Sequence, residues 1–312
     1  MKKIIILSMF FIVSVSIFSG FVLSRTSQNM SIRIHSKDLP EQGLTIINPS
    51  DPSFDARLAN AVAGEPSEVV NDFKPYSIFL ENKSRQTVVA YMIQWCFTKG
   101  DGTNDCYRKA FSSPRALMEG EYLPAEYEAR SGRIKPNSSI LFSLISPDGS
   151  GPFRLSISRE EAEKIKQGAK PDKSELLHRF SSELAKYTDV TVSIDGAFFE
   201  DGTFVGDDTS GFFVQIEAQI NAKRDLLNEL AVNTADPHKS KDEVFSHLRT
   251  FAEQPATDLS NQSTPADYYN HFKRFYANEI LSMRQTLGDE KGLAIALEPI
   301  KKPWRRLTKK QK

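Results

Sequence analysis

Carboxylates and glycines gather in one short stretch of the chain, residues 189–211. Its candidate metal ligands are Asp195, Glu200, Asp201, Asp207 and Asp208. Calcium takes several oxygen ligands from glycine-bent loops, so one hypothesis is a calcium site, and a related one is a hydrolase that uses these carboxylates. The spacing does not match an EF-hand. The alternative is structural: Asp-Gly and Gly-Asp pairs form turns, and the last two aspartates cap a helix.

Other arrangements typical of enzymes do not occur in the sequence. There is no Gly-x-Ser-x-Gly pattern for a serine nucleophile and no glycine-rich phosphate loop. The five histidines are scattered, and none of them has the spacing of a zinc motif. The sequence therefore favours a protein that is not an enzyme, with the carboxylate-using hydrolase as the alternative.

The two cysteines, Cys96 and Cys106, form a closely spaced pair without a Cys-x-x-Cys motif. In an oxidising compartment such a pair is expected to form a disulfide, and the alternative is two free buried thiols. The short loop that the bridge would close predicts a stabilisation of about 2–3 kcal/mol.

The N-terminus predicts export. Lys2 and Lys3 precede an uncharged apolar run, residues 4–23, and Arg25 follows it. This pattern is typical of an export signal, and the run is also just long enough to span a bilayer. Residues 1–24 are therefore expected to be a cleaved signal or an uncleaved single-pass anchor. Either outcome places the rest of the chain in the periplasm or outside the cell.

The C-terminal end, residues 299–312, is basic, although the whole chain balances 40 basic against 40 acidic residues. The residues considered for contact with lipid headgroups or another polyanion are Lys301, Lys302, Trp304, Arg305 and Arg306. The alternative is a solvated end, and we expect this segment to be disordered. Nucleic acid is not an expected partner for an exported protein.

The pattern of elements predicts an α+β fold. Short strand-like runs separated by Gly and Pro turns predict an antiparallel β-sandwich over residues 31–211, with a helical pair inserted at about 158–187. Asp195-Gly196 is predicted to be a tight turn after a strand. Residues 212–220 fit a strand or a helix, and the continuation of the pattern to residue 232 favours the helix. Residues 212–298 are then a helical region packed on the sandwich.

The expected function is a non-enzymatic binding or assembly module of the cell envelope. Its expected partner is an unknown protein or envelope component, and a membrane surface is a second candidate, contacted through the basic end. No cofactor is expected, apart from the calcium hypothesis.

Overall fold

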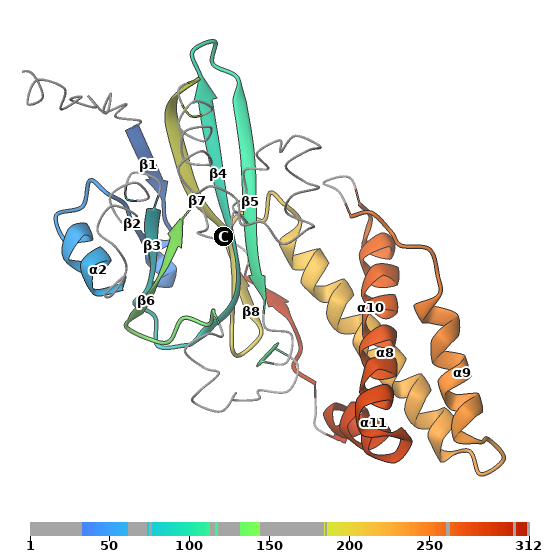
Figure 1. The fold of residues 1–312 in the computed structure, drawn as a ribbon. Coiled ribbons are helices and arrows are strands. Elements are labelled where there is room, and N and C mark those ends of the chain that lie inside the picture. The colour runs from blue at the N-terminus through green and yellow to red at the C-terminus, as the bar shows by residue number, and fades with distance from the viewer. Residues whose placement is uncertain are drawn as a thin grey trace, which may run out of the picture. The chain divides into compact units, whose positions relative to one another are not determined.

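The computed structural model describes most of the chain after residue 32 (Figure 1). The described residues are 33–61, 74, 77–112, 116–117, 132–143, 184, 186–259, 263–301 and 304–310. The predicted export signal lies outside them. The predicted helical insertion, residues 158–187, also lies outside them except for Leu184, Lys186 and Tyr187. Tyr187 begins a strand rather than ending a helix.

The described elements are mixed, as an α+β fold requires. The strands are β1 Arg33–Lys37, β2 Leu44–Ile47, β3 Ser77–Asn82, β4 Val88–Lys99, β5 Asn104–Ser112, β6 Ser138–Ser143, β7 Tyr187–Phe199, β8 Thr203–Val205 and β9 Thr308–Lys309. The helices are α2 Phe54–Ala61, α8 Phe212–Ala235, α9 Lys241–Ala252, α10 Pro265–Leu287 and α11 Asp289–Leu297, with short 3-10 helices η1 Pro40–Gln42 and η3 Glu298–Lys301.

The larger sheet has six strands and is mixed. Its order is β5-β4-β7-β8-β9, and β1 also pairs with β7. The central pairings of β4 with β5 and β7 are antiparallel, but β1 is parallel to β7 and β9 is parallel to β8. The prediction of a purely antiparallel fold is therefore wrong. Each parallel pair joins strands that are distant in sequence, which is the connection that parallel pairing needs.

The smaller sheet is antiparallel, with the order β2-β3-β6. Successive side chains of a strand point to opposite faces, and β3 follows this rule. Leu80 joins a buried cluster that also contains Trp95 and Val192 of the larger sheet. Phe79 packs on the other face with Phe54 of α2. Both sheets thus contribute to one core, and α2 covers part of the outer face of the smaller sheet.

The region after residue 211 is helical, as predicted, and two of its helices start at capping boxes. α8 confirms the helix chosen for residues 212–232. Ser240 with Glu243, and Thr264 with Asp267, form reciprocal capping boxes that start α9 and α10. Within the described residues, no helix is both long enough and apolar enough to cross a bilayer.

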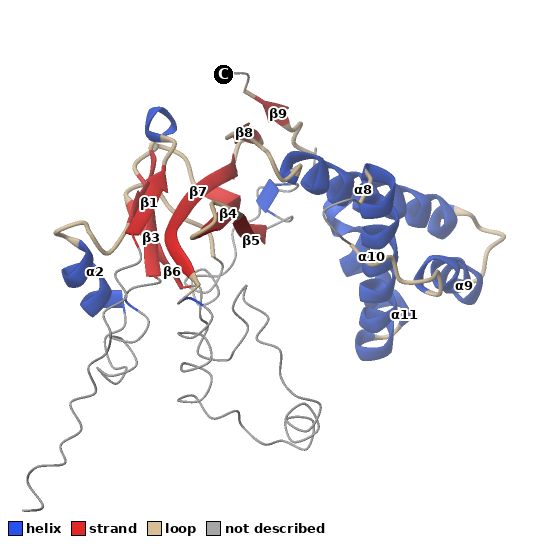
Figure 2. Ribbon diagram, turned by 90° about the horizontal axis from the view of Figure 1, so that it is seen from above, coloured by secondary structure: helices blue, strands red, loops and turns tan. Residues whose placement is uncertain are grey.

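The packing of these helices differs from the prediction. Only the first turns of α8 join buried residues of the sheet: Phe212 and Ile216 cluster with Phe198 and Phe204. Further along α8, Leu226, Leu227 and Leu230 form a separate core with α9, α10 and α11 (Figure 2). The C-terminal helices therefore pack mainly on one another.

Candidate functional site

The predicted Asp195-Gly196 turn does not exist, because β7 continues through it to Phe199. Met92 of β4 pairs with Gly196 and Ile93 pairs with Ile194, so Asp195 has no partner on β4. This is a β-bulge, in which one strand carries an extra residue, and a bulge redirects a side chain locally. Asp-Gly predicts a turn when it is read alone, but here it marks an irregularity within a long strand.

The bulge places the Asp195 carboxylate beneath the loop that leads into α8. Oδ1 accepts hydrogen bonds from the Thr209 amide at 2.8 Å and the Thr209 hydroxyl at 2.6 Å. Oδ2 accepts from the Ser210 amide at 3.0 Å and from the Ser210 hydroxyl. The residue is only 3% exposed. Burial alone would raise the pKa of Asp195, but the hydrogen bonds from Ser210 and Thr209 outweigh it and lower the pKa.

The backbone of this loop lies directly on the bulge. The Asp208 amide donates to the Asp195 carbonyl at 2.8 Å. Gly206 has a φ of +118°, and a Cβ atom there would lie 2.5 Å from the same carbonyl oxygen. Only glycine fits this approach. Asp195 and Gly206 thus help to build one compact junction between β7 and α8.

Asp208 is the second organising carboxylate of this junction. Its φ is 57°, in the left-handed region that aspartate tolerates better than most residues. Oδ1 accepts from the Phe213 amide at 3.0 Å, so the side chain satisfies a free donor in the first turn of α8. Oδ2 lies 2.7 Å from Lys309 Nζ, and the Asp208 side chain is 4% exposed. Gly211 is the N-cap by position, but Asp208 supplies the capping oxygen.

The other three carboxylates of the stretch point to separate partners. Asp207 pairs with Lys37 of β1 at 3.2 Å. Asp201 accepts from the Thr203 amide at 2.8 Å and from Gln86 at 2.9 Å. Its pKa is lowered, because these hydrogen bonds outweigh the effect of burial.

Glu200 lies near the Thr87 amide, with 3.4 Å between Oε1 and N. Among the described residues, no group of three or more His, Cys, Asp or Glu side chains is placed to hold a metal ion. In the structure, all five candidate ligands thus take part in hydrogen bonds or ion pairs within the protein.

The predicted disulfide is present. Cys96 of β4 and Cys106 of β5 are directly opposite each other in the antiparallel ladder, and their sulfur atoms are bonded. The bridge closes the β4–β5 hairpin. A disulfide indicates an oxidising compartment, because reducing compartments keep such pairs as thiols.

The described part of the basic end is not disordered, contrary to the prediction. Thr308 and Lys309 form β9 on β8, and Trp304 packs against both the sheet-side and the helical clusters. The Arg224 guanidinium lies 5.2 Å from the centre of the Trp304 ring. Apolar contacts of Trp304 and Leu307 fix a segment that charge alone predicts to be solvated.

The five residues proposed for polyanion contact do not form one exposed set. Arg306 is exposed, whereas Trp304 and Arg305 are partly buried. Lys301 ends η3, and Lys302 lies outside the described residues.

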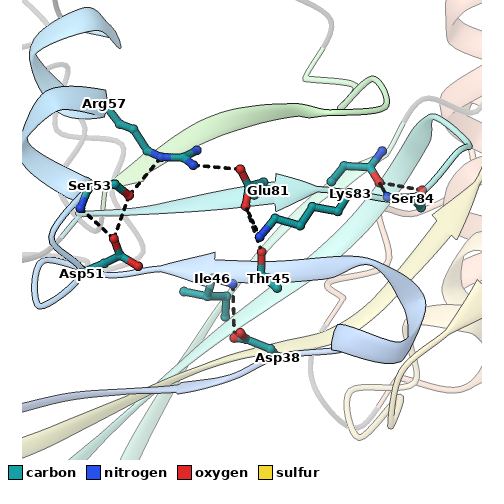
Figure 3. Close-up of polar contacts among 10 residues, drawn as sticks. Asp38, Thr45, Ile46, Asp51, Ser53, Arg57, Glu81, Lys83 and Ser84 are labelled. Atoms are coloured by element: carbon teal, nitrogen blue, oxygen red, sulfur yellow. Dashed lines mark hydrogen bonds and ion pairs between the residues drawn. The ribbon is translucent and has the colours of Figure 1, made fainter.

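Figure 3 shows a polar cluster on the smaller sheet. The sequence pattern did not predict this cluster. Glu81 of β3 accepts from Arg57 of α2 at 2.9 Å, and Lys83 approaches it at 3.0 Å. Thr45 of β2 donates to the same carboxylate at 3.3 Å. Burial alone would raise the pKa of Glu81, but the hydrogen bonds and positive charges of Lys83 and Arg57 outweigh it and lower the pKa. The cluster joins α2 to the sheet, and its carboxylate is fully engaged by the chain's own cations.

A small cavity lies between α8, α10 and α11. Lys223, Leu227, Tyr276 and Ile280 contribute to its lining, and its volume is about 30 Å³. This volume suits about one water molecule and is far below that of an organic ligand site.

The junction of β7, β8, α8 and β9 brings together two buried carboxylates, Asp195 and Asp208, with their hydrogen-bond donors and Lys309. Its geometry can hold a loop, start a helix and bind a lysine-bearing strand. In comparisons with known proteins, no protein family, no curated protein and no solved structure matched this chain.

Proposed function

We propose that this chain is an exported protein that acts by binding or assembly in the cell envelope. The observation that carries the proposal is the Cys96–Cys106 bridge. A disulfide between two neighbouring strands fits a protein that matures in an oxidising compartment. The two lysines and the apolar run at the N-terminus independently favour export from the cytoplasm.

The carboxylates favour binding or assembly over hydrolysis. A general acid or base must reach the substrate with its own oxygen atoms. Asp195 is almost fully buried and accepts four hydrogen bonds from Thr209 and Ser210. Asp208 is engaged by an amide and by Lys309. The two most buried carboxylates of the stretch therefore support the fold.

In this proposal the two sheets act as one sandwich-like body that carries the junction and the helical region. The basic end supplies a surface: Arg306 and Lys310 are exposed beside β8. We extend the proposal to a weak contact of these cations with anionic headgroups, because each basic residue near such a surface contributes about 1 kcal/mol. Vesicle co-sedimentation of the wild type and of a variant carrying Arg306→Gln and Lys310→Gln measures it. Equal binding by both proteins would reject the contact.

Export itself is tested with a reporter enzyme that becomes active only outside the cytoplasm. Residues 1–31 fused to this reporter are expected to give activity. Val13→Arg places a charge in the apolar run and is expected to abolish it, whereas Val13→Leu keeps the run apolar and is expected to leave it unchanged. An inactive wild-type fusion would contradict the proposal.

A further inference from the structure

The segment from Trp304 to Lys310 is bound to the body of the chain as a short added strand. The Thr308 amide donates to the Gly202 carbonyl at 3.1 Å, and the Lys310 amide donates to the Phe204 carbonyl at 3.1 Å. Both bonds use the edge of β8 that faces away from β7. A strand edge recognises another strand through these backbone groups, and side chains at alternate positions give selectivity.

Two alternate side chains of the segment make the selective contacts. Leu307 packs against the cluster that contains Phe204 and Phe212. Two positions later, the Lys309 ammonium lies 2.7 Å from Asp208 Oδ2. The ammonium is also 5.5 Å from the Phe204 ring centre and 5.8 Å from that of Phe213, within reach of a cation–π contact. The site therefore recognises an extended segment in which an apolar residue is followed two positions later by a lysine, with any residue between them.

The strand pairing of the bound segment is short. β9 has two residues, and the Lys309 side chain is 45% exposed. Arg305 Nη1 is buried without a hydrogen-bond partner among the described residues, which weakens the bound state. Short strands with few backbone hydrogen bonds open locally at a small fraction of the global stability. When this segment leaves, β8 presents an unpaired edge, which is a template for another chain.

We propose that the β8 edge with Asp208 is a strand-binding site that also accepts residues 304–310 of a second copy of this chain. A second copy offers the same leucine and lysine at the same spacing, so its segment satisfies every contact seen within one chain. Exchange of an identical element between copies is a low-cost route to assembly. The inference deepens the assembly role proposed above and rests on it. Its test is separate, since failure of exchange would leave export and the disulfide unaffected.

Two full-length variants test the exchange. Asp208→Asn keeps an oxygen for the Phe213 amide but loses the charge that binds lysine. Lys309→Met keeps the side-chain length but loses the ammonium. Each variant alone has a weakened contact between its own segment and its own site. Their mixture pairs an intact Lys309 on one copy with an intact Asp208 on the other.

Sedimentation velocity of the mixture is expected to show association about two- to fivefold tighter than that of either variant alone, the effect of one partly exposed ion pair. The matched control is a double variant, Arg306→Met with Asp208→Asn, used in place of the Asp208→Asn single variant. It loses a neighbouring cation but keeps Lys309. It is therefore expected to associate with Lys309→Met as tightly as the single variant does. Association of the mixture no tighter than that of the separate variants, with both folded by circular dichroism, overturns the proposal.

The wild-type chain gives a second measurement that does not depend on the variants. A tethered segment competes at an effective concentration of about 1 mM, so exchange becomes measurable as the protein approaches this range. Dimers that form with concentration and require Lys309 support the proposal. A wild-type chain that stays monomeric throughout this range overturns it.

Discussion

Replacing Asp195 by asparagine removes the charge that holds the loop before α8. The asparagine oxygen can still accept from one neighbour, but its NH2 group faces the amide and hydroxyl donors of the other. At least one buried backbone donor then loses its acceptor. Hydrogen bonds to a charged group contribute about 1.5–3 kcal/mol each, and the hydroxyls can reorient, so we expect a loss of about 2–4 kcal/mol in the free energy of unfolding.

Urea unfolding followed by far-UV circular dichroism measures this loss. Asp207→Asn is the matched control, because its carboxylate makes a more exposed ion pair with Lys37. We expect this control to change the free energy of unfolding by about 0.5 kcal/mol or less. An Asp195→Asn protein as stable as the control would refute the role assigned to the bulge.

The same pair of proteins has a predicted pH dependence. The pKa of Asp195 is lower in the folded protein than the usual value of about 3.9. Its contribution is therefore fully present above the unfolded-state pKa and is lost as the pH falls through the folded-state pKa. The stability difference between wild type and Asp195→Asn should shrink as the pH is lowered from about 5 toward the folded-state pKa. A difference that stays constant over this range would contradict the sign of the shift.

Three further predictions concern the neighbouring features. Gly202→Ala is expected to destabilise the docked C-terminal segment by about 1–3 kcal/mol, because Gly202 has a φ of +87° and its Cβ would lie 2.7 Å from the Arg306 carbonyl oxygen. Hydrogen exchange of the Thr308 and Lys310 amides measures this effect, and Gly100→Ala, with no atom near its Cβ, should leave both amides protected. Cys96→Ser with Cys106→Ser is expected to reduce the free energy of unfolding by about 2–3 kcal/mol in urea titrations, and an unchanged midpoint would show that the bridge adds no stability. Calcium at about 1 mM is expected to leave the melting temperature unchanged, whereas a rise of several degrees would restore the calcium hypothesis.

The sequence predicted those elements whose signals are local. The capping residues Ser240 and Thr264 start helices because their partners lie three residues later on the same chain. The apolar run of β4 forms a central strand, and the close cysteines meet across one hairpin. These features depend on neighbours in sequence, so periodicity and spacing were sufficient to find them.

The missed features depend on contacts between distant segments. Asp195 lies in a bulge because β4 pairs with the residue before it, Ile194, and with the residue after it, Gly196. No local sequence pattern shows that pairing. β9 is held by Leu307 and Lys309, whose partners Phe204 and Asp208 lie about a hundred positions earlier in the chain, whereas charge counting alone predicts a solvated end. The Glu81 cluster likewise joins a helix and two strands whose register is set by the fold.

The compartment in which the chain matures can be tested directly through the state of its two cysteines. Cells expressing the untagged protein can be quenched with acid, fractionated, and treated with one alkylating reagent before reduction and a second reagent after it. Mass spectrometry then reads the state of Cys96 and Cys106 in each fraction. The account predicts that the protein is found in the exported fraction and that both cysteines carry only the second reagent. Protein in the cytosol with both cysteines carrying the first reagent would contradict it.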